Sequence, residues 1–295
     1  MNIDGVFAGG GAKAFAFIGA IQVVEERGYC FQRLAGTSAG AITASFIKAG
    51  YTSEEILHLL NSVDLKTFLD ETWLQNKVPL WKWISVYWKL GLYKGDELEK
   101  WIDRCLEAKG IKTFGDLPEG SLKIIASDLT KGRLLVLPDD LPLYGVIPET
   151  FSVARAVRMS CSLPYFFKPV KLYGKGRDPS IVVDGGLLSN FPIWIFIKKA
   201  GDKPVRPVIG FQLTPSLEEI REKKIRNAFD MYQSLFETMR NAHDMRYITK
   251  THAKNIVFIP VHQIKATDFH IDDIMKKKLM EAGKMKTKLF LKDWI

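Results

Sequence analysis

Residues 36–40 read Gly-Thr-Ser-Ala-Gly, and this pentapeptide limits the folds open to the chain more than any other stretch. It fits the G-x-S-x-G pattern, in which a nucleophilic serine lies on a sharp turn between a strand and a helix. The two residues before it can end a short buried strand, and residues 39–49 predict a helix that ends before a glycine. The context that the pattern requires is therefore present, and Ser38 is the predicted nucleophile.

The two glycines of this turn, Gly36 and Gly40, have a mechanical role. A nucleophile turn holds its serine in a strained backbone conformation, and side chains two residues on either side would collide where strand and helix cross. The pattern alone is only suggestive, because a chain with 23 glycines can contain it by chance. Two further motifs strengthen it.

The first of these motifs is a glycine loop near the start of the chain, Gly-Gly-Gly-Ala-Lys at residues 9–13. Residues 3–8 predict a buried strand before the loop, and residues 14–27 predict a helix that is apolar nearly all round. A loop between a strand and a helix can point several backbone N–H groups at one anion, close to the positive end of the helix. We therefore expect this loop to bind an anion.

Three anions are conceivable. A dinucleotide pyrophosphate is disfavoured because Ala14 stands where the last glycine of its fingerprint belongs, and a nucleotide phosphate is disfavoured because Lys13 is followed by alanine. The oxyanion of an acyl-transfer intermediate remains, and Ser38 follows on the next predicted strand to supply the nucleophile. The backbone of three residues would form this oxyanion hole: Gly9, Gly10 and Gly11.

The second supporting motif is Asp184 with Gly185 and Gly186. Residues 181–183 predict a buried strand, and an aspartate at the carboxyl end of such a strand lies where sites form in open α/β sheets. An Asp-Gly pair in isolation is more typical of a turn. Together with the serine turn and the glycine loop, however, Asp184 becomes a candidate general base, with a pKa raised by partial burial.

The remaining chain alternates between predicted strands and helices, which indicates an α/β fold. Further strands are predicted at residues 122–126, 134–137, 170–172, 207–212 and 256–261. Further helices are predicted at residues 151–159, 192–200, 217–250 and 271–288. Thr52 with Glu55, and Asp96 with Glu99, predict the capped starts of two more helices. No linker or repeat interrupts the pattern, so we expect one domain over residues 1–295, with a helical cap segment at about 52–110.

The chain carries three cysteines, Cys30, Cys105 and Cys161, in no metal-binding spacing. An odd, unclustered set suits reduced thiols in a cytosol better than a disulfide framework. The N-terminus shows neither a basic leader nor an apolar core of a secretory signal. We therefore expect a cytoplasmic protein that needs no metal and no cofactor.

A formal charge of +9 predicts attraction to an anionic partner, either nucleic acid or an acidic membrane surface. No nucleic-acid-binding signature accompanies the charge, so we expect no nucleic acid partner. Residues 80–90 (LWKWISVYWKL) interleave tryptophan with lysine, as in a helix that rests on anionic lipid at the inner face of a membrane. A buried cap helix with Lys82 and Lys89 on its solvated face is the alternative.

The order and spacing of the three motifs resemble the patatin-like phospholipase family. The resemblance covers most of the chain, including residues 154–169. It implies a three-layer α/β/α fold with a mostly parallel central sheet, and a Ser-Asp dyad that hydrolyses acyl esters of lipids without histidine or calcium. In this resemblance Ser38 matches the nucleophile, Asp184 matches the base, and residues 9–11 match the oxyanion loop. The residues that support these motifs are Lys13, Gly36, Gly40, Gly185 and Gly186.

Two departures from a simple assignment stay open. The glycine that usually follows the basic residue of the family's loop is Ala14 here. A Ser-His-Asp triad also remains possible in chain order, because four histidines follow Asp184: His243, His252, His262 and His270. Only two predicted strands precede Ser38, however, which is unlike an ordinary α/β-hydrolase.

The motifs and the resemblance together predict a lipid acyl hydrolase of the phospholipase A type, which works through an acyl-enzyme intermediate. Its substrate would be a phospholipid or another acyl-ester lipid. The alternatives are a soluble carboxylesterase or thioesterase, and a non-catalytic lipid- or nucleic-acid-binding module.

Overall fold

The computed structural model describes residues 1–70, 88, 90–174, 176, 178–197, 205–215, 225–226, 230–231, 234–236, 238–239, 253–261 and 271–294. The predicted helices at 217–250 and the tryptophan segment at 80–90 lie largely outside these residues. The four histidines that follow Asp184 lie wholly outside them.

Ten strands and six α-helices have their bounds within the described residues. The strands are β1 (Asn2–Phe7), β2 (Cys30–Thr37), β3 (Gly91–Tyr93), β4 (Leu122–Asp128), β5 (Arg133–Leu137), β6 (Tyr165–Phe167), β7 (Val170–Leu172), β8 (Ser180–Asp184), β9 (Val208–Pro215) and β10 (Ile256–Val261). The α-helices are α1 (Phe15–Glu26), α2 (Ala39–Lys48), α3 (Ser53–Asn61), α6 (Asp96–Glu107), α7 (Val153–Ser160) and α10 (Asp273–Phe290). Short 3-10 helices include η1 (Gly11–Ala14), η2 (Leu65–Leu69), η6 (Gly185–Leu187) and η7 (Ile193–Ile195).

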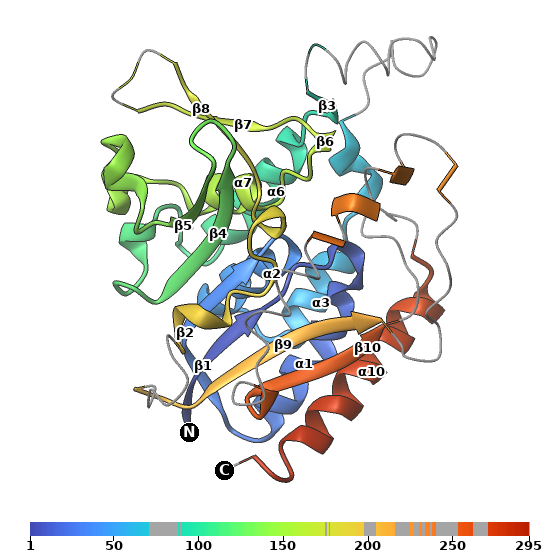
Figure 1. Cartoon of the computed structure of the whole chain (residues 1–295). Coiled ribbons are helices and arrows are strands. Elements are labelled where there is room, and N and C mark those ends of the chain that lie inside the picture. Colours follow the sequence, from blue (N-terminus) through green and yellow to red (C-terminus); the bar gives the residue numbers. More distant parts are fainter. Residues whose placement is uncertain are drawn as a thin grey trace.

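The central sheet has the strand order β10-β9-β1-β2-β4-β8-β7, with β5 also paired to β4 (Figure 1). The pairs from β10 to β4 are all parallel, whereas β5, β7 and β8 pair antiparallel. Strand β1 lies in the middle and is almost wholly buried, as expected for a parallel strand that is covered on both faces. The predicted mostly parallel sheet is therefore confirmed.

Strand β4 brings the ends of two other strands together. β5 pairs with residues 124–128 along one edge of β4. β2 pairs with residues 122–125 and β8 with residues 126–128, and since a strand has only two edges, β2 and β8 share the other one. The carboxyl ends of β2 and β8 therefore meet on the same edge of β4.

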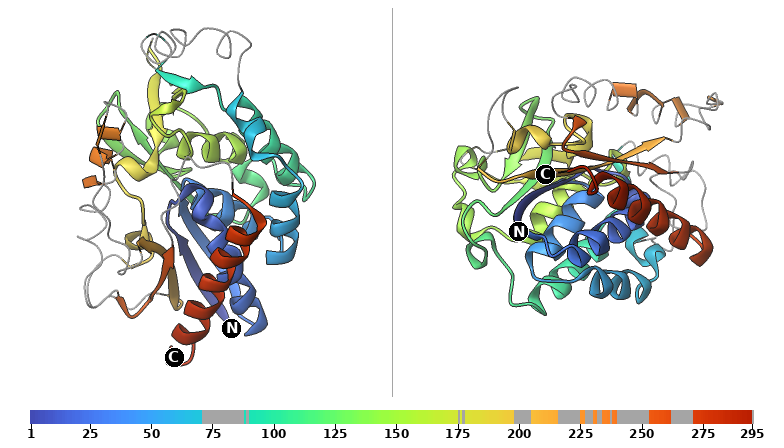
Figure 2. Two further views of the ribbon diagram at one scale, coloured as in Figure 1. Left: turned by 90° about the vertical axis from the view of Figure 1, so that its right-hand side faces the viewer. Right: turned by 90° about the horizontal axis from the view of Figure 1, so that it is seen from below.

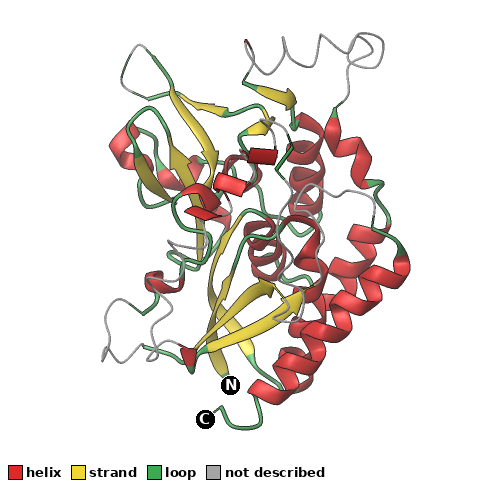
Figure 3. Ribbon diagram, turned by 45° about the vertical axis from the view of Figure 1, so that its right-hand side comes forward, coloured by secondary structure: helices red, strands yellow, loops and turns green. Residues whose placement is uncertain are grey.

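Helices cover both faces of the sheet, which gives the three layers. Figure 2, seen from below, shows α1, α2 and α10 on one side and the described helical pieces of residues 230–239 on the other. Helices α1 and α10 run close together along the sheet (Figure 3). Their contact needs glycine, because a Cβ on Gly19 would lie 1.9 Å from the Met280 carbonyl oxygen, and one on Gly283 would lie 1.9 Å from that of Ala16. The predicted three-layer α/β/α fold is confirmed.

The structure tests the predicted N-terminal caps of two helices. The predicted capping box of Thr52 and Glu55 is confirmed at the start of α3. The predicted cap by Asp96 is wrong, because the N-cap of α6 is Gly95, in the left-handed region with φ 74°. The carboxylate of Asp70 instead accepts the N–H of Asp96 at 2.7 Å, so the cap comes from a preceding loop rather than from the helix itself.

The predicted helix at 192–200 is also shorter than expected. Its described part contains only η7, a single 3-10 turn, and residues 198–200 lie outside the described set.

Within the described residues, no helix is both long enough and apolar enough to cross a bilayer.

Candidate active site

Ser38 lies at the turn between β2 and α2, with φ 53° and ψ −124°. Such a conformation costs a non-glycine residue about 1–3 kcal/mol, and it persists only where the surroundings hold it. A Cβ on Gly36 would lie 2.3 Å from the Gly40 carbonyl oxygen, and a Cβ on Gly40 would lie 2.3 Å from that of Phe7. Both glycines are therefore needed for the crossing of strand and helix, as the motif predicts.

The glycine loop lies directly beside Ser38. A Cβ on Gly9 would lie 3.3 Å from the Cβ of Ser38 and 2.4 Å from Oδ1 of Asn190. The Gly9 N–H already donates to the Asn190 carbonyl oxygen at 3.0 Å. Among the hydrogen bonds of the described residues, none uses the N–H of Gly10 or Gly11. Lys13 follows within η1, and its N–H donates to the Gly10 carbonyl oxygen at 3.3 Å.

Asp184 ends β8 and is only 4% exposed. It lies opposite Ala126 on β4, while Thr37, the residue before Ser38, lies opposite the adjacent Ile125. Neighbouring residues on a strand are about 3.3 Å apart, and both pairs lie on the same edge of β4. The fold thus places Ser38 and Asp184 at adjoining positions, although they are 146 positions apart in the sequence.

The two glycines after Asp184 fix its carboxylate. The Gly186 N–H donates to Asp184 Oδ1 at 2.7 Å. A Cβ on Gly185 would lie 2.3 Å from the Ile125 carbonyl oxygen, so only glycine allows this close approach to β4. The pattern Asp-Gly-Gly therefore positions the acid at the edge where Ser38 lies.

Cys161 is a site residue that the sequence analysis did not single out. Its thiol is buried, and the Ser38 side chain and the Asp184 carboxylate both lie close enough to it to influence its pKa. Burial, and then the negative charge of Asp184, raise the pKa of the Cys161 thiol, which keeps it protonated. One buried side chain thus lies close to both Ser38 and Asp184.

Ser160 and Ser189 also hold the serine turn, and neither was predicted as a site residue. The hydroxyl of Ser160 accepts the N–H of Ser38 at 2.8 Å. The hydroxyl of Thr37 donates to the Ser189 carbonyl oxygen at 3.0 Å. The sequence predicts a helix at residues 151–159, and the family resemblance covers residues 154–169, but no local pattern there marks a contact with residue 38.

The assembled groups are a serine hydroxyl on a strained turn, a buried carboxylate beside it, and two backbone amides of a glycine loop. A nucleophile, a proton acceptor and an oxyanion site are the parts that acyl transfer requires. In the part of the chain that the structure describes, no three side chains of His, Cys, Asp or Glu converge on a point where a metal ion could bind.

A comparison with protein families matches the model of the patatin-like phospholipases to residues 5–197. The chain belongs to the patatin-like phospholipase family. The matched residues begin before the glycine loop and end after Asp184, so they contain all three motifs of the site.

Relatives of this patatin-like protein include one that matches it over nearly the whole length of both chains. The uncharacterized protein YqhO of Bacillus subtilis is 55% identical over 294 residues, which cover 100% of this chain and 99% of that protein. The probable lipid hydrolase 463L of Invertebrate iridescent virus 6 is 25% identical over 65% of this chain and 62% of its own. Among solved structures, VipD from Legionella pneumophila shares the fold with a TM-score of 0.60, at 17% identity over 99% of this chain and 67% of VipD.

Proposed function

We propose that this patatin-like protein is a lipid acyl hydrolase that cleaves fatty acyl esters of phospholipids, as a phospholipase A does. The observation that carries the proposal is the meeting of Ser38 and Asp184 on one edge of β4. Family membership and the relative named a probable lipid hydrolase support a lipid ester as the substrate.

In the proposed reaction Asp184 removes the proton of the Ser38 hydroxyl while the serine oxygen attacks the ester carbonyl carbon. The carbonyl oxygen becomes an oxyanion, and the N–H groups of Gly10 and Gly11 stabilise it. The alcohol leaves with the proton that Asp184 accepted, and the acyl group stays on Ser38. Water then attacks the acyl-enzyme with Asp184 again as the base, which releases the fatty acid and restores the serine.

Gly9 has a different task in this proposal. Its N–H is occupied by Asn190, and its lack of a side chain leaves room for the Ser38 side chain. Lys13 follows the loop at the start of the buried helix, where its charge adds to the positive end of the helix dipole.

The described residues also offer a surface through which lipid could reach the site. Trp88 is 76% exposed, Leu90 and Tyr165 are exposed as well, and the pairing of Gly91 with Tyr165 brings the last two close together. We call these three residues the β3 surface. Tyr165 follows Ser162 by three residues, and the Ser162 carbonyl oxygen accepts the Asp184 N–H, so Tyr165 belongs to the segment that binds the backbone of Asp184.

We propose that the β3 surface rests on an anionic membrane, with Trp88 and Leu90 as part of a helical cap at about residues 52–110, in a single-domain cytoplasmic protein. Exposed aromatic and aliphatic side chains insert at the lipid interface, and the formal charge of +9 favours anionic head groups. Of the tryptophan segment at 80–90, the structure describes only Trp88 and Leu90.

The test compares the purified full chain with its Ser38→Ala variant on a short chromogenic ester and on mixed phospholipid vesicles, with and without EDTA. We expect hydrolysis of both substrates by the wild type, survival of the activity in EDTA, and its loss in Ser38→Ala. Ser45→Ala is the matched control, because Ser45 is a buried serine of α2 whose hydroxyl donates only within its own helix, to the Ala41 carbonyl oxygen at 2.7 Å. Activity on the short ester alone would favour a soluble esterase, and activity in Ser38→Ala would overturn the proposal.

A further inference from the structure

The turn at the end of α7, residues 160–162, touches both halves of the proposed dyad. At one end of the turn, the Ser160 hydroxyl accepts the backbone N–H of Ser38 and donates to the Ile125 carbonyl oxygen. At the other end, the Ser162 carbonyl oxygen accepts the backbone N–H of Asp184 at 2.9 Å. Three consecutive residues thus bind the backbone of the nucleophile and of the acid.

The contact with Ser160 is the one that acts on the strained residue. Ser38 has a positive φ, which a serine adopts only when its surroundings hold it there. The Ser38 N–H is directed at Ser160, and Ser160 is fully buried and tied to β4 through Ile125. Loss of the Ser160 oxygen would leave this N–H without its acceptor, and the turn would be free to rotate toward a relaxed conformation.

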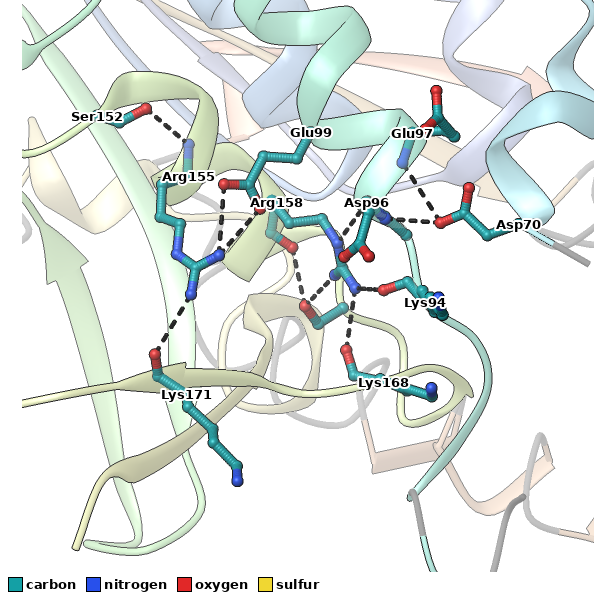
Figure 4. Close-up of polar contacts among 12 residues, drawn as sticks. Asp70, Lys94, Asp96, Glu97, Glu99, Ser152, Arg155, Arg158, Lys168 and Lys171 are labelled. Atoms are coloured by element: carbon teal, nitrogen blue, oxygen red, sulfur yellow. Dashed lines mark hydrogen bonds and ion pairs between the residues drawn. The ribbon is translucent and has the colours of Figure 1, made fainter. Parts of the chain in front are cut away.

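Arg158 holds the turn from the other side (Figure 4). It is 2% exposed, and its guanidinium donates to the Ser162 hydroxyl at 2.5 Å, while the Ser162 hydroxyl donates back to the Arg158 carbonyl oxygen at 2.8 Å. Among the ion pairs of the described residues, none includes Arg158. Its remaining hydrogen bonds go to backbone carbonyl oxygens of three residues: Lys94, Gly95 and Lys168.

These carbonyl oxygens belong to the links that precede α6 and follow β6, so Arg158 fixes the turn relative to two other segments. A guanidinium suits this task because its donors form a rigid planar fork. The guanidinium of Arg158 also fills the space beside Gly95, since a Cβ on Gly95 would lie 2.5 Å from the guanidinium carbon. A shorter or more flexible cation could not meet all four acceptors at once.

We propose that Ser160 is a positioning residue for the nucleophile, and that Arg158 holds the turn that carries it. The turn sets the orientation of Ser38 relative to Asp184 without touching substrate. This inference rests on the proposed function, because it concerns the reactivity of the Ser38 hydroxyl.

The experiment measures kcat and KM on a short chromogenic ester, and the rate at which a fluorophosphonate labels Ser38, in Ser160→Ala and Ser45→Ala. Both variants remove one hydroxyl from a buried serine, but only Ser160 contacts Ser38. We expect Ser160→Ala to lower kcat and the labelling rate by about 10- to 100-fold, while its KM stays within about twofold of the wild-type value. We expect Ser45→Ala to change neither kcat nor the labelling rate by more than about twofold. Arg158→Lys should lower kcat in the same manner.

Ser160→Cys keeps the length of the side chain close to that of serine and replaces the oxygen with a larger and weaker acceptor, so it decides the question if Ser160→Ala does not fold. We expect its kcat and labelling rate to fall below those of Ser45→Ala. Rates in either folded Ser160 variant that equal those of Ser45→Ala would overturn the inference and leave the proposed function standing. A wild-type protein that neither hydrolyses the ester nor reacts with the fluorophosphonate would instead contradict the proposed function itself.

Discussion

Gly11 allows the proposed role of the glycine loop to be tested at a single residue. Its φ is 56°, a region that costs other residues about 1–2 kcal/mol, and its amide is one of the two proposed oxyanion donors. Gly11→Ala should therefore lower kcat by about tenfold or more while KM changes little, because the amide meets a charge that develops in the transition state.

Gly28 provides the matched control for this change. It has a φ of 70°, nothing would contact a Cβ there, and it lies beyond α1. Gly28→Ala should introduce similar backbone strain and lower Tm, yet leave kcat unchanged. Equal kcat values for the two variants would contradict the oxyanion role of Gly11.

The burial of the cysteine thiols predicts which of them can be alkylated. The thiolate is the reactive form, and burial raises the pKa of Cys105 to about 11. Burial and the Asp184 carboxylate raise the pKa of Cys161, so the thiol next to Ser38 stays protonated at neutral pH. Iodoacetamide at pH 8 should modify only the exposed Cys30, as read by peptide mass spectrometry. Rapid alkylation of Cys161 would contradict this account of the site.

A local sequence pattern marks some residues of the site, whereas others have no such pattern. Ser38 and Asp184 could be predicted because glycines must stand next to them, and these glycines are visible in the sequence. Ser160 and Cys161 could not be predicted in this way. Their contacts with Ser38 join residues more than 120 positions apart, and either role needs only a small side chain in a buried turn.

At the scale of the element, the crossing of α1 and α10 gives a test of the packing. In an open helix Gly→Ala stabilises by about 1 kcal/mol, but a Cβ on Gly283 would overlap the Ala16 carbonyl oxygen of the facing helix. Gly283→Ala should therefore destabilise the protein by about 2 kcal/mol, which thermal unfolding would show as a lower Tm. Gly176→Ala, with no atom nearer than 3.8 Å, should leave Tm unchanged. A higher Tm in Gly283→Ala would contradict the close crossing.

Most described elements follow from apolar periodicity and glycine positions, and the errors have a common cause. The sequence predicts Asp96 as the cap of α6 because capping residues usually stand beside the helix they cap. The actual acceptor, Asp70, is 26 residues earlier and reaches α6 only through the fold. The antiparallel placement of β8 beside β4 likewise depends on pairing that no local pattern specifies.

At the scale of the whole molecule, strand β3 and the end of α10 lie at opposite ends of the structure (Figure 1). Trp88→Ala with Leu90→Ala should weaken sedimentation with anionic vesicles and slow hydrolysis of vesicle lipid, because exposed apolar side chains carry the proposed contact. Activity on a short soluble ester and Tm should stay unchanged.

Met285→Ala with Leu289→Ala is the control, since these two exposed apolar residues lie on α10. It should leave vesicle binding as in the wild type. If both double variants bound vesicles equally well, the β3 surface would not be the membrane contact.

The pairing of Ser38 with Asp184 is most directly tested by the rate at which a fluorophosphonate labels the wild type and Asp184→Asn, with the modified residue identified by mass spectrometry. A neutral amide cannot take the serine proton, so we predict labelling at Ser38 in the wild type and a rate at least about 100-fold lower in Asp184→Asn, with Tm showing both to be folded. Labelling of a different serine, or an equal rate in folded Asp184→Asn, would contradict the Ser-Asp dyad.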